Sequence, residues 1–374
     1  MRDKTREATG ENFLMKNSLK ISKIEDREII EDKLLKLEDL LKTMKRVLIG
    51  YSGGVDSAML AVAAHRVLGN DAICVTADSE SYASGELERA KEITSQFDIP
   101  HKIINTRELD NPAYAKNSPD RCYHCKSELF SHMSIMAKNL KVDYILYGQN
   151  ADDIGDFRPG EKAAKETGVR APLAEAAMTK QDVRTLAKRW GLSVWDRPAM
   201  ACLSSRFPYG TRVSAEGLKK IDRAEAFLKT HLGYSQLRSR HHGDLNRIEI
   251  PVSQLSNLLN STSKRQDITK AMEKIGYLYS TIDLRGFRTG SMNEVLLGIS
   301  EENQQPVEKQ IYSILHKNNF SSGCYEIRDK LLYLRLSEND VRRLSEDKLR
   351  NQLISDMEPT KLLYIALDID SLKT

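Results

Sequence analysis

Hydrophobic positions recur every three or four residues over 24–45, between charged side chains. The recurring residues are Ile30, Leu34, Leu37, Leu41 and Met44. This spacing predicts an amphipathic helix. The apolar run at 46–51 follows at once and is typical of a buried parallel strand.

Strand-like and helix-like segments then alternate as far as residue 147. Short apolar runs predict further strands at 72–77, 101–105 and 144–147. Helical patterns occupy 57–68, 86–97 and 126–139. The alternation predicts an α/β fold with a doubly wound, mostly parallel sheet, whose ligands bind at the carboxyl ends of the strands.

The pattern changes after residue 150. Residues 150–212 are rich in Asp, Arg, Pro and Gly, with one helix at 180–190, which is typical of chemistry carried on loops. A smaller α+β module is predicted next, with helices at 214–232 and 252–259 and strands at 247–250 and 277–284. Beyond residue 298 the pattern restarts as helix, strand and helix, and it ends in an apolar strand at 362–367.

These patterns predict a division of the chain into four parts. No internal repeat is visible in the sequence. The parts are a disordered segment at 1–23, a nucleotide-binding α/β domain at 24–212, an α+β domain for substrate or oligomerisation at 213–298, and a C-terminal α/β extension of unassigned role at 299–374.

Composition narrows the class of protein. The 57 basic and 53 acidic residues leave a net charge of +4, which does not call for a nucleic-acid partner. We find no apolar run long enough to span a bilayer and no signal peptide, so we expect a cytoplasmic protein without a membrane partner. The odd count of 5 cysteines favours thiol or metal chemistry over a disulfide framework.

A glycine-rich loop connects the first predicted strand to the next helix. It consists of Ser52, Gly53, Gly54, Val55, Asp56 and Ser57. The two glycines allow a sharp turn close to a charged group, and the amides and dipole of the following helix favour an anion. Ser52 and Ser57 add hydroxyl donors, while Asp56 is a candidate to hold Mg²⁺ or to orient the helix start. We interpret the loop as a pyrophosphate site rather than an ordinary capped turn.

The loop resembles the SGGxDS signature of the N-type ATP pyrophosphatases, also called PP-loop enzymes. The resemblance implies an adenine nucleotide alpha hydrolase-like fold and cleavage of ATP between its α and β phosphates. It also implies that backbone groups at Thr76 and Ala77 hold the adenine. The loop from Gly148 to Asp153, which includes Asp152, is expected to close over the nucleotide.

Three of the cysteines lie in loop-rich sequence. Cys122 and Cys125 form a CxxC pair, which alone fits zinc, iron–sulfur, redox or incidental roles equally. Together with Cys202 they supply the three thiolates that leave one iron of a cubane cluster open. Cys74 is interpreted as a buried small hydrophobe, and Cys324 receives no role.

Longer strings of sequence resemble the LarE family of ATP-dependent sulfur transferases, over roughly residues 45–292. The strings lie at 119–126, 148–153, 156–160, 168–173, 201–206 and 237–249. The resemblance implies thiolation of the carboxylates of a pyridinium mononucleotide, for a nickel-pincer nucleotide cofactor. It implies that Cys202 carries the sulfur, and that three-cysteine members hold a [4Fe-4S] cluster while single-cysteine members sacrifice their own sulfur. We favour the cluster type, with ATP and Mg²⁺ as further cofactors.

The same resemblance implies a substrate-binding set. Its members are Arg206, Arg238, Arg240, Glu225 and Glu249. Guanidinium groups pair with phosphate or carboxylate in bidentate fashion, and Arg238 and Arg240 share a face if they lie on a strand. The resemblance further implies a homo-oligomer and contacts with other proteins of the cofactor pathway.

Three other functions stay open at this level. A tRNA thiolase shares the ATP loop and can use three cysteines, although no RNA-binding domain is evident. An ammonia-using adenylating ligase would need no cysteine in its cleft. A nucleotide sensor without chemistry would not need Ser52, Asp56 and Ser57 intact.

Overall fold

The computed structural model describes residues 27–154, 159–198, 201–234, 236–292, 306–320 and 323–370. The disorder predicted for 1–23 lies outside these residues. The chain divides into two compact units. The first unit comprises Met1–Ser79, Ser84–Glu108 and Cys122–Met200, and the second comprises Glu80–Ala83, Leu109–Arg121 and Ala201–Thr374.

A parallel sheet forms the centre of the first unit, which confirms the predicted fold class. Its strands are β1 (Val47–Gly50), β2 (Ala72–Asp78), β3 (His101–Asn105) and β4 (Tyr144–Tyr147). The order is β3-β2-β1-β4, so the chain moves outward from β1 to β3 and then returns to the other side of β1. Ligands of doubly wound sheets bind where the strand order reverses, and here that point is the carboxyl end of β1.

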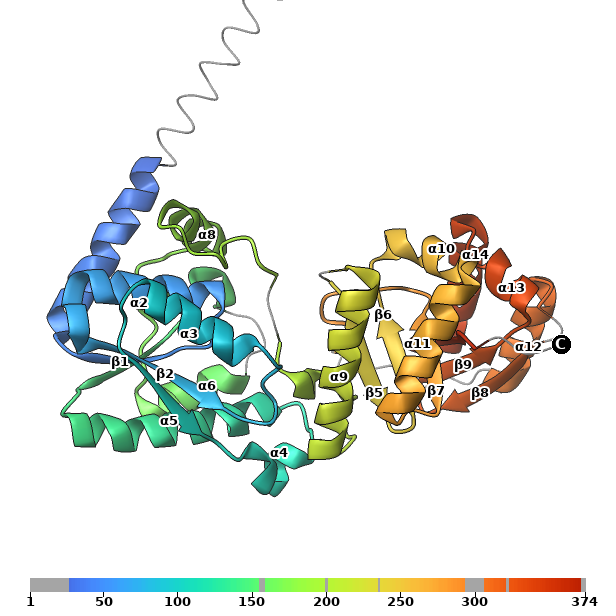
Figure 1. Ribbon diagram of the computed structural model, residues 1–374, viewed down its shortest axis with the longest axis horizontal. Helices are drawn as coiled ribbons and strands as arrows, with labels where there is room; N and C mark the ends of the chain where they lie inside the picture. The colour runs from blue at the N-terminus through green and yellow to red at the C-terminus, as the bar shows by residue number, and fades with distance from the viewer. Residues whose placement is uncertain are drawn as a thin grey trace, which may run out of the picture. The chain divides into compact units, whose positions relative to one another are not determined.

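Helices cover both faces of this sheet (Figure 1). They include the helix at 27–44, α2 (Val55–Leu68), α3 (Glu86–Gln96), α5 (Arg121–Leu140), α6 (Pro159–Thr167), α7 (Pro172–Glu175) and α8 (Lys180–Arg189). Alternate residues of β1 serve the two faces: Val47 and Ile49 pack in one hydrophobic cluster with α2 and α8, and Leu48 packs in another with α5 and α6. Leu37, Leu41 and Met44 of the predicted amphipathic helix are buried.

The first unit also contains the short segments η1 (Gly69–Asp71) and η3 (Ala151–Asp153), and η2 (Glu108–Asp110) begins at its boundary. Two further short segments, α4 (Pro112–Ala115) and η4 (Leu203–Arg206), belong to the second unit. None of the helices among the described residues is long and apolar enough to cross a membrane.

The second unit contains a six-stranded mixed sheet with the order β5-β6-β7-β10-β9-β8. Its strands are β5 (Arg238–His242), β6 (Leu245–Glu249), β7 (Tyr279–Asp283), β8 (Cys324–Arg328), β9 (Leu331–Arg335) and β10 (Tyr364–Asp368). Its helices are α9 (Ala215–Leu232), α10 (Val252–Asn260), α11 (Thr262–Ile275), α12 (Val307–Lys317), α13 (Glu338–Arg343), α14 (Asp347–Met357) and η6 (Glu358–Thr360).

The boundary predicted near residue 298 does not separate two sheets. β10, from the predicted extension, pairs with β7, from the predicted α+β domain, and apolar residues of both segments share one buried cluster. Local hydrophobic patterns could not reveal this pairing, because it joins strands that lie far apart in the sequence.

Candidate active site

The phosphate loop, Ser52 to Ser57, lies at the reversal point of the first sheet. Gly53 adopts a positive φ of 69°, a conformation that favours glycine, and Gly54 precedes α2 without any side-chain cap. The Ser57 hydroxyl lies 3.1 Å from the Gly54 carbonyl oxygen and 3.2 Å from the Ser52 hydroxyl. The loop therefore presents uncapped helix amides and two hydroxyls, which is the donor set that a pyrophosphate requires.

Thr76 and Ala77 lie at the carboxyl end of β2, beside this loop. The β1 register ends at Val75, whereas β2 continues to pair with β3 through Asp78. The Thr76 hydroxyl donates to the Tyr51 carbonyl oxygen at 2.7 Å, so this side chain holds the two strand ends together. Backbone groups at Thr76 and Ala77 are suitably placed for an adenine, and that role stays a prediction.

The loop at 148–153 packs directly against the phosphate loop. A Cβ added at Gly148 would lie 2.6 Å from the Ser57 nitrogen, so only glycine allows this approach. Asn150 donates from Nδ2 to Asp56 Oδ1 at 3.1 Å, and its own Oδ1 accepts from the Asp152 amide at 3.0 Å. These contacts bring the two loops together within the first unit. Closure of this loop over a nucleotide stays a prediction.

Lys180, which the sequence analysis did not single out, completes this site. Its ammonium donates to Asp56 Oδ2, and its backbone amide donates to Asp152 Oδ2 at 2.8 Å. Mg²⁺ binds proteins through one or two carboxylates together with phosphate oxygens, and Asp56 and Asp152 fit that requirement. The only sequence signal for Lys180 was its place one residue after the N-cap Thr179 of α8.

Cys122 and Cys125 lie in the first turn of α5, where residues three apart share a helix face. Cys122 is exposed and Cys125 is partly buried, with its sulfur 3.8 Å from Glu108 Oε1. The next residue, Lys126, lines a small pocket together with Tyr147, Gly148, Gln149, Asp153 and Glu161. Helix α5, which carries Cys122 and Cys125, and the loop at 148–153, which is predicted to close over the nucleotide, thus line the same pocket.

Cys202 belongs to the second unit, where it is the N-cap of η4 and is partly buried. Arg206 fixes its backbone: Nη1 donates to the carbonyl oxygens of Ala201 at 2.7 Å and Cys202 at 3.1 Å. Among the residues described, no three His, Cys, Asp or Glu side chains form a metal site. The cluster therefore stays a prediction.

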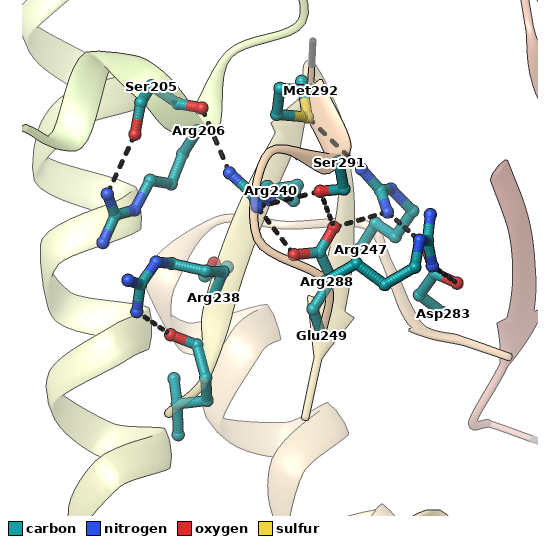
Figure 2. A network of polar contacts seen from close by, with 12 residues as sticks. Ser205, Arg206, Arg238, Arg240, Arg247, Glu249, Asp283, Arg288, Ser291 and Met292 are labelled. Carbon is teal, nitrogen blue, oxygen red and sulfur yellow. Dashed lines mark hydrogen bonds and ion pairs between the residues drawn. The ribbon is translucent and has the colours of Figure 1, made fainter. Parts of the chain in front are cut away.

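Arginine and carboxylate side chains on η4, α9, β5, β6 and β7 of the second unit form a buried cluster, most of which Figure 2 shows. We call Arg206, Arg238, Arg240 and Arg247, with Glu225, Glu249 and Asp283, the arginine cluster. All seven are buried. The structure thus brings together all five predicted substrate residues and adds Arg247 and Asp283, which the sequence analysis missed.

Arg206 is fully occupied by protein groups. Its Nε and Nη2 bind both oxygens of Glu225, at 2.8 and 3.0 Å. Burial acts to raise the pKa of Glu225, but the Arg206 charge holds that pKa below its usual range. This geometry gives Arg206 a positioning role for the Cys202 loop, and direct binding of substrate stays a prediction.

Glu249 is the acceptor for two arginines and a hydroxyl. It lies 2.7 Å from Arg240 Nη2, 2.8 Å from Arg247 Nη1 and 3.0 Å from the Ser291 hydroxyl. Burial acts to raise the pKa of Glu249, yet the two guanidinium groups lower it. Arg247 also pairs with Asp283, whose pKa is raised by complete burial and by Glu249.

Arg238 differs from its neighbours. No carboxylate among the described residues pairs with it; Nη1 donates to the Leu237 carbonyl oxygen at 2.7 Å, and the guanidinium lies 5.2 Å from the centre of the Phe287 ring. Burial, together with the charges of Arg206 and Arg240, lowers the pKa of Arg238 to about 10. Arg240 Nε is buried and has no acceptor among the described residues. This unpaired donor and the uncompensated charge of Arg238 favour an anionic ligand.

The fold and the phosphate loop define the first unit as a PP-loop ATP pyrophosphatase domain, and the chain is an ATP-dependent enzyme of this class. The sequence model of the NAD synthase family matches residues 29–141. The chain belongs to the LarE family: it is 34% identical to the pyridinium-3,5-bisthiocarboxylic acid mononucleotide synthase of Lactiplantibacillus plantarum over 257 residues, which cover 68% of this chain and 92% of that protein.

Two other relatives define the extent of the similarity. An uncharacterised protein of Synechocystis is 42% identical over 268 residues, which cover 72% of this chain and 99% of that protein. A glutamine-hydrolysing GMP synthase of Nostoc is 32% identical over 131 residues, which cover only 32% of this chain and 24% of that protein. Similarity to LarE-type relatives therefore extends well beyond the part of the chain that matches GMP synthase.

Proposed function

We propose that this chain adenylates the carboxylates of a pyridinium biscarboxylate mononucleotide and converts them to thiocarboxylates, for nickel-pincer nucleotide biosynthesis. One observation carries the proposal beyond ATP use: the Cys202 backbone belongs to the same connected network as Arg238, which has no carboxylate partner among the described residues. Glu225 joins them, because it binds Arg206, which holds the Cys202 carbonyl, and it also accepts from the Ser239 amide beside Arg238 at 3.2 Å.

The activation step uses the first unit. A carboxylate oxygen of the substrate attacks the α-phosphorus of ATP, the bond to the bridging oxygen breaks, and pyrophosphate leaves. The helix amides, Ser52 and Ser57 stabilise the departing pyrophosphate, and Mg²⁺ held at Asp56 and Asp152 would screen its charge. Lys180, whose ammonium binds Asp56 in this structure, would then be available to the phosphates.

The delivery step replaces AMP by sulfur. A sulfur nucleophile adds to the activated carboxyl carbon, and the bond between that carbon and the AMP oxygen breaks. We propose that Cys122, Cys125 and Cys202 hold a [4Fe-4S] cluster, which would supply an exchangeable sulfide for this step. In the competing route, the Cys202 sulfur forms a thioester, loss of the Cα proton breaks the Cβ–S bond, and dehydroalanine remains.

The arginine cluster supplies the substrate site. The phosphate of the mononucleotide would pair with Arg238, which has no carboxylate partner among the described residues, and with Arg240 Nε, which has no acceptor among them. The protein would act as a homo-oligomer alongside other proteins of the cofactor pathway, as the family resemblance implies.

The proposal is tested with anaerobically purified protein, ATP, Mg²⁺ and the pyridinium biscarboxylate mononucleotide. We expect substrate-dependent pyrophosphate release and, by mass spectrometry, replacement of carboxylate oxygen by sulfur. Cys202→Ala should abolish sulfur transfer while pyrophosphate release continues, and Cys324→Ala, an exposed cysteine on β8, should change neither. Full thiolation by Cys202→Ala would exclude the proposal, and tight, salt-sensitive tRNA binding would favour a tRNA thiolase instead.

Iron analysis separates the two sulfur routes. The cluster type predicts brown protein with about four irons per chain, and loss of that iron in Cys122→Ala or Cys125→Ala. Iron-free protein whose Cys202 becomes dehydroalanine after turnover would exclude the cluster in favour of the sacrificial route.

Arg238 is tested by substitution. Arg238→Gln should raise the KM for the mononucleotide about 10- to 100-fold, because one charge-assisted pair to phosphate contributes roughly 1.5–3 kcal/mol. The KM for ATP should not change. Arg212→Gln, which changes an exposed arginine in the same unit, is the control and should leave both constants near their normal values.

A further inference from the structure

The second unit repeats one order of elements twice. The first series is α9, β5, β6, α10, α11 and β7, and the second is α12, β8, β9, α13, α14 and β10. In each series a helix leads into an antiparallel hairpin, two helices follow, and the last strand lies parallel to the second strand of the hairpin. Figure 1 shows the two series side by side in one sheet.

Backbone details repeat as well. Gly243 and Asp329, in the two hairpin turns, both have positive φ. Gly276 and Lys361, which precede the last strand of each series, also have positive φ. The Asp244 carbonyl oxygen accepts from the amides of 278 and 279, and the Lys330 carbonyl oxygen accepts from those of 363 and 364. Each last strand ends in an aspartate that accepts from the amide two residues on: Asp283 from Arg285 at 2.8 Å and Asp368 from Asp370 at 2.9 Å.

The two series meet with two-fold symmetry. β7 and β10 pair antiparallel, with Ile282 opposite Leu367 at the centre. On either side, the Leu284 amide donates to the Ile365 carbonyl oxygen and the Ile369 amide donates to the Ser280 carbonyl oxygen, both at 3.0 Å. Equivalent residues thus exchange equivalent bonds, which is the signature of an isologous interface between two copies of one module.

We infer that residues 307–368 are a diverged second copy of the module at 215–283, and that this copy acts as a built-in partner at the β7 edge. The Synechocystis relative is covered to 99% by 268 residues of this chain, so a relative of that length has no room for a second copy. An exposed edge strand pairs readily with another chain. Here that edge is already occupied by β10.

The second copy has lost the anion-binding side chains. The positions equivalent to Arg238, Arg240 and Arg247 hold Cys324, Glu326 and Tyr333. Tyr279 and Asp283 keep their counterparts, Tyr364 and Asp368. The arginine cluster is therefore present in the first copy and absent from the second. Because few side chains are the same at equivalent positions, no repeat is visible in the sequence.

The retained tyrosine supports the cluster of the other copy. The Arg247 guanidinium lies 3.9 Å from the centre of the Tyr364 ring, a close cation–π contact. The reciprocal position is occupied by Tyr279, which contacts Tyr333 and Arg328 with ring-centre distances of 5.5 and 4.8 Å. Tyr364 is thus a positioning residue: it holds Arg247, which in turn binds Glu249 and Asp283.

The association is tested in the full chain, with a protease recognition sequence inserted between Met292 and Pro306. After the folded protein is cleaved, we expect the two pieces to co-elute in size-exclusion chromatography at low micromolar concentration, as the uncleaved protein does. Separation of the pieces on cleavage would overturn the inference. This readout is independent of substrate, so its failure is distinct from failure of the proposed function.

The supporting role of Tyr364 is tested by hydrogen exchange. Tyr364→Leu removes the ring, and amides of β6 and β7 should exchange at least 10-fold faster, whereas Tyr364→Phe keeps the ring and should exchange at the normal rate. Faster exchange confined to β10, or equal exchange in both variants, would contradict the role assigned to Tyr364.

Discussion

The Lys180 ammonium binds the Asp56 carboxylate and so joins the start of α8 to the phosphate loop. Both groups are partly exposed, at 32% and 19% for the side chains, so a nucleotide can reach them. Under the proposed function, the carboxylate would hold Mg²⁺ and the ammonium would meet phosphate when ATP binds. We therefore propose that Lys180 offsets the charge of Asp56 in the free enzyme and that of the phosphates in the complex.

Lys180→Gln should therefore weaken the use of ATP. The lost charge-assisted contact contributes about 1.5–3 kcal/mol, so kcat/KM for ATP should fall roughly 10- to 100-fold in a pyrophosphate-release assay. Lys188→Gln is the matched control, because Lys188 lies on the same helix but contacts the Trp195 ring at 4.3 Å. Equal kinetics for the two variants would remove Lys180 from the nucleotide site.

Gly148 and Gly50 provide a second comparison. A Cβ at Gly148 would lie 2.6 Å from the Ser57 nitrogen, whereas a Cβ at Gly50 would meet its nearest neighbour at an ordinary 3.5 Å. Gly148→Ala must push the phosphate loop away, and we expect ATP binding measured by calorimetry to become undetectable. Gly50→Ala should bind ATP within about threefold of the normal affinity, since no backbone needs to move. Normal ATP binding by Gly148→Ala would show that the two loops do not need this close approach.

The fold of the first unit was largely predictable because each element carries its own signal. The parallel strands are short apolar runs, and Ser52 to Ser57 identify the end of β1 as a ligand site. The fold of the second unit was harder to predict from the sequence. Its hairpin at β8 and β9 was predicted as one strand, and the pairing of β10 with β7 depends on contacts remote in sequence.

The site was predictable in its residue types but not in its pairings. Arg238 and Arg240 do lie on one strand, as the predicted shared face requires. The sequence does not show that Arg206 forms an ion pair with Glu225 while Arg238 has no carboxylate partner among the described residues. Both are arginines within stretches of sequence that resemble the family, and their partners depend on the fold. Arg247 and Lys180 were missed because their partners, Asp283 and Asp56, come from elements distant in the chain.

Glu249 should matter for stability of the second unit. Glu249→Gln leaves the buried Arg240 and Arg247 without their shared counter-charge, and breaking a buried pair in this way costs about 3–5 kcal/mol. Both tryptophans, Trp190 and Trp195, lie in the first unit. Calorimetry should therefore show a lowered transition for the second unit while unfolding followed by tryptophan fluorescence stays in place.

The control for this change is Glu216→Gln. Glu216 is exposed and pairs with Lys220 on one face of α9, so its loss should cost under about 1 kcal/mol. Similar destabilisation by both variants, or a shift of the tryptophan transition with Glu249→Gln, would contradict a local ionic role for Glu249.

His241 predicts how stability depends on pH. It is buried on β5, with Nδ1 3.1 Å from the Tyr277 hydroxyl and its ring 4.8 Å from that of Phe207. Burial, with a smaller effect of Lys220, lowers the pKa of His241 to about 4 from the usual value of about 6.5. Between these two values the unfolded state binds a proton that the folded state does not.

Stability of the second unit should therefore fall as the pH is lowered from about 6.5 towards 4, by up to roughly 3 kcal/mol from this residue. Glu225 and Glu249 act in a different window: their lowered pKa values stabilise the fold above about pH 4.5, and this stabilisation is lost only at more acid pH. His241→Gln should thus reduce the difference between calorimetric transition temperatures at pH 7 and pH 5. Desolvation of the partly buried His242, with the nearby charge of Arg247, also lowers the pKa of His242, so some dependence of stability on pH remains in the variant. An unchanged difference in His241→Gln would show that His241 is not the group whose protonation destabilises the folded unit.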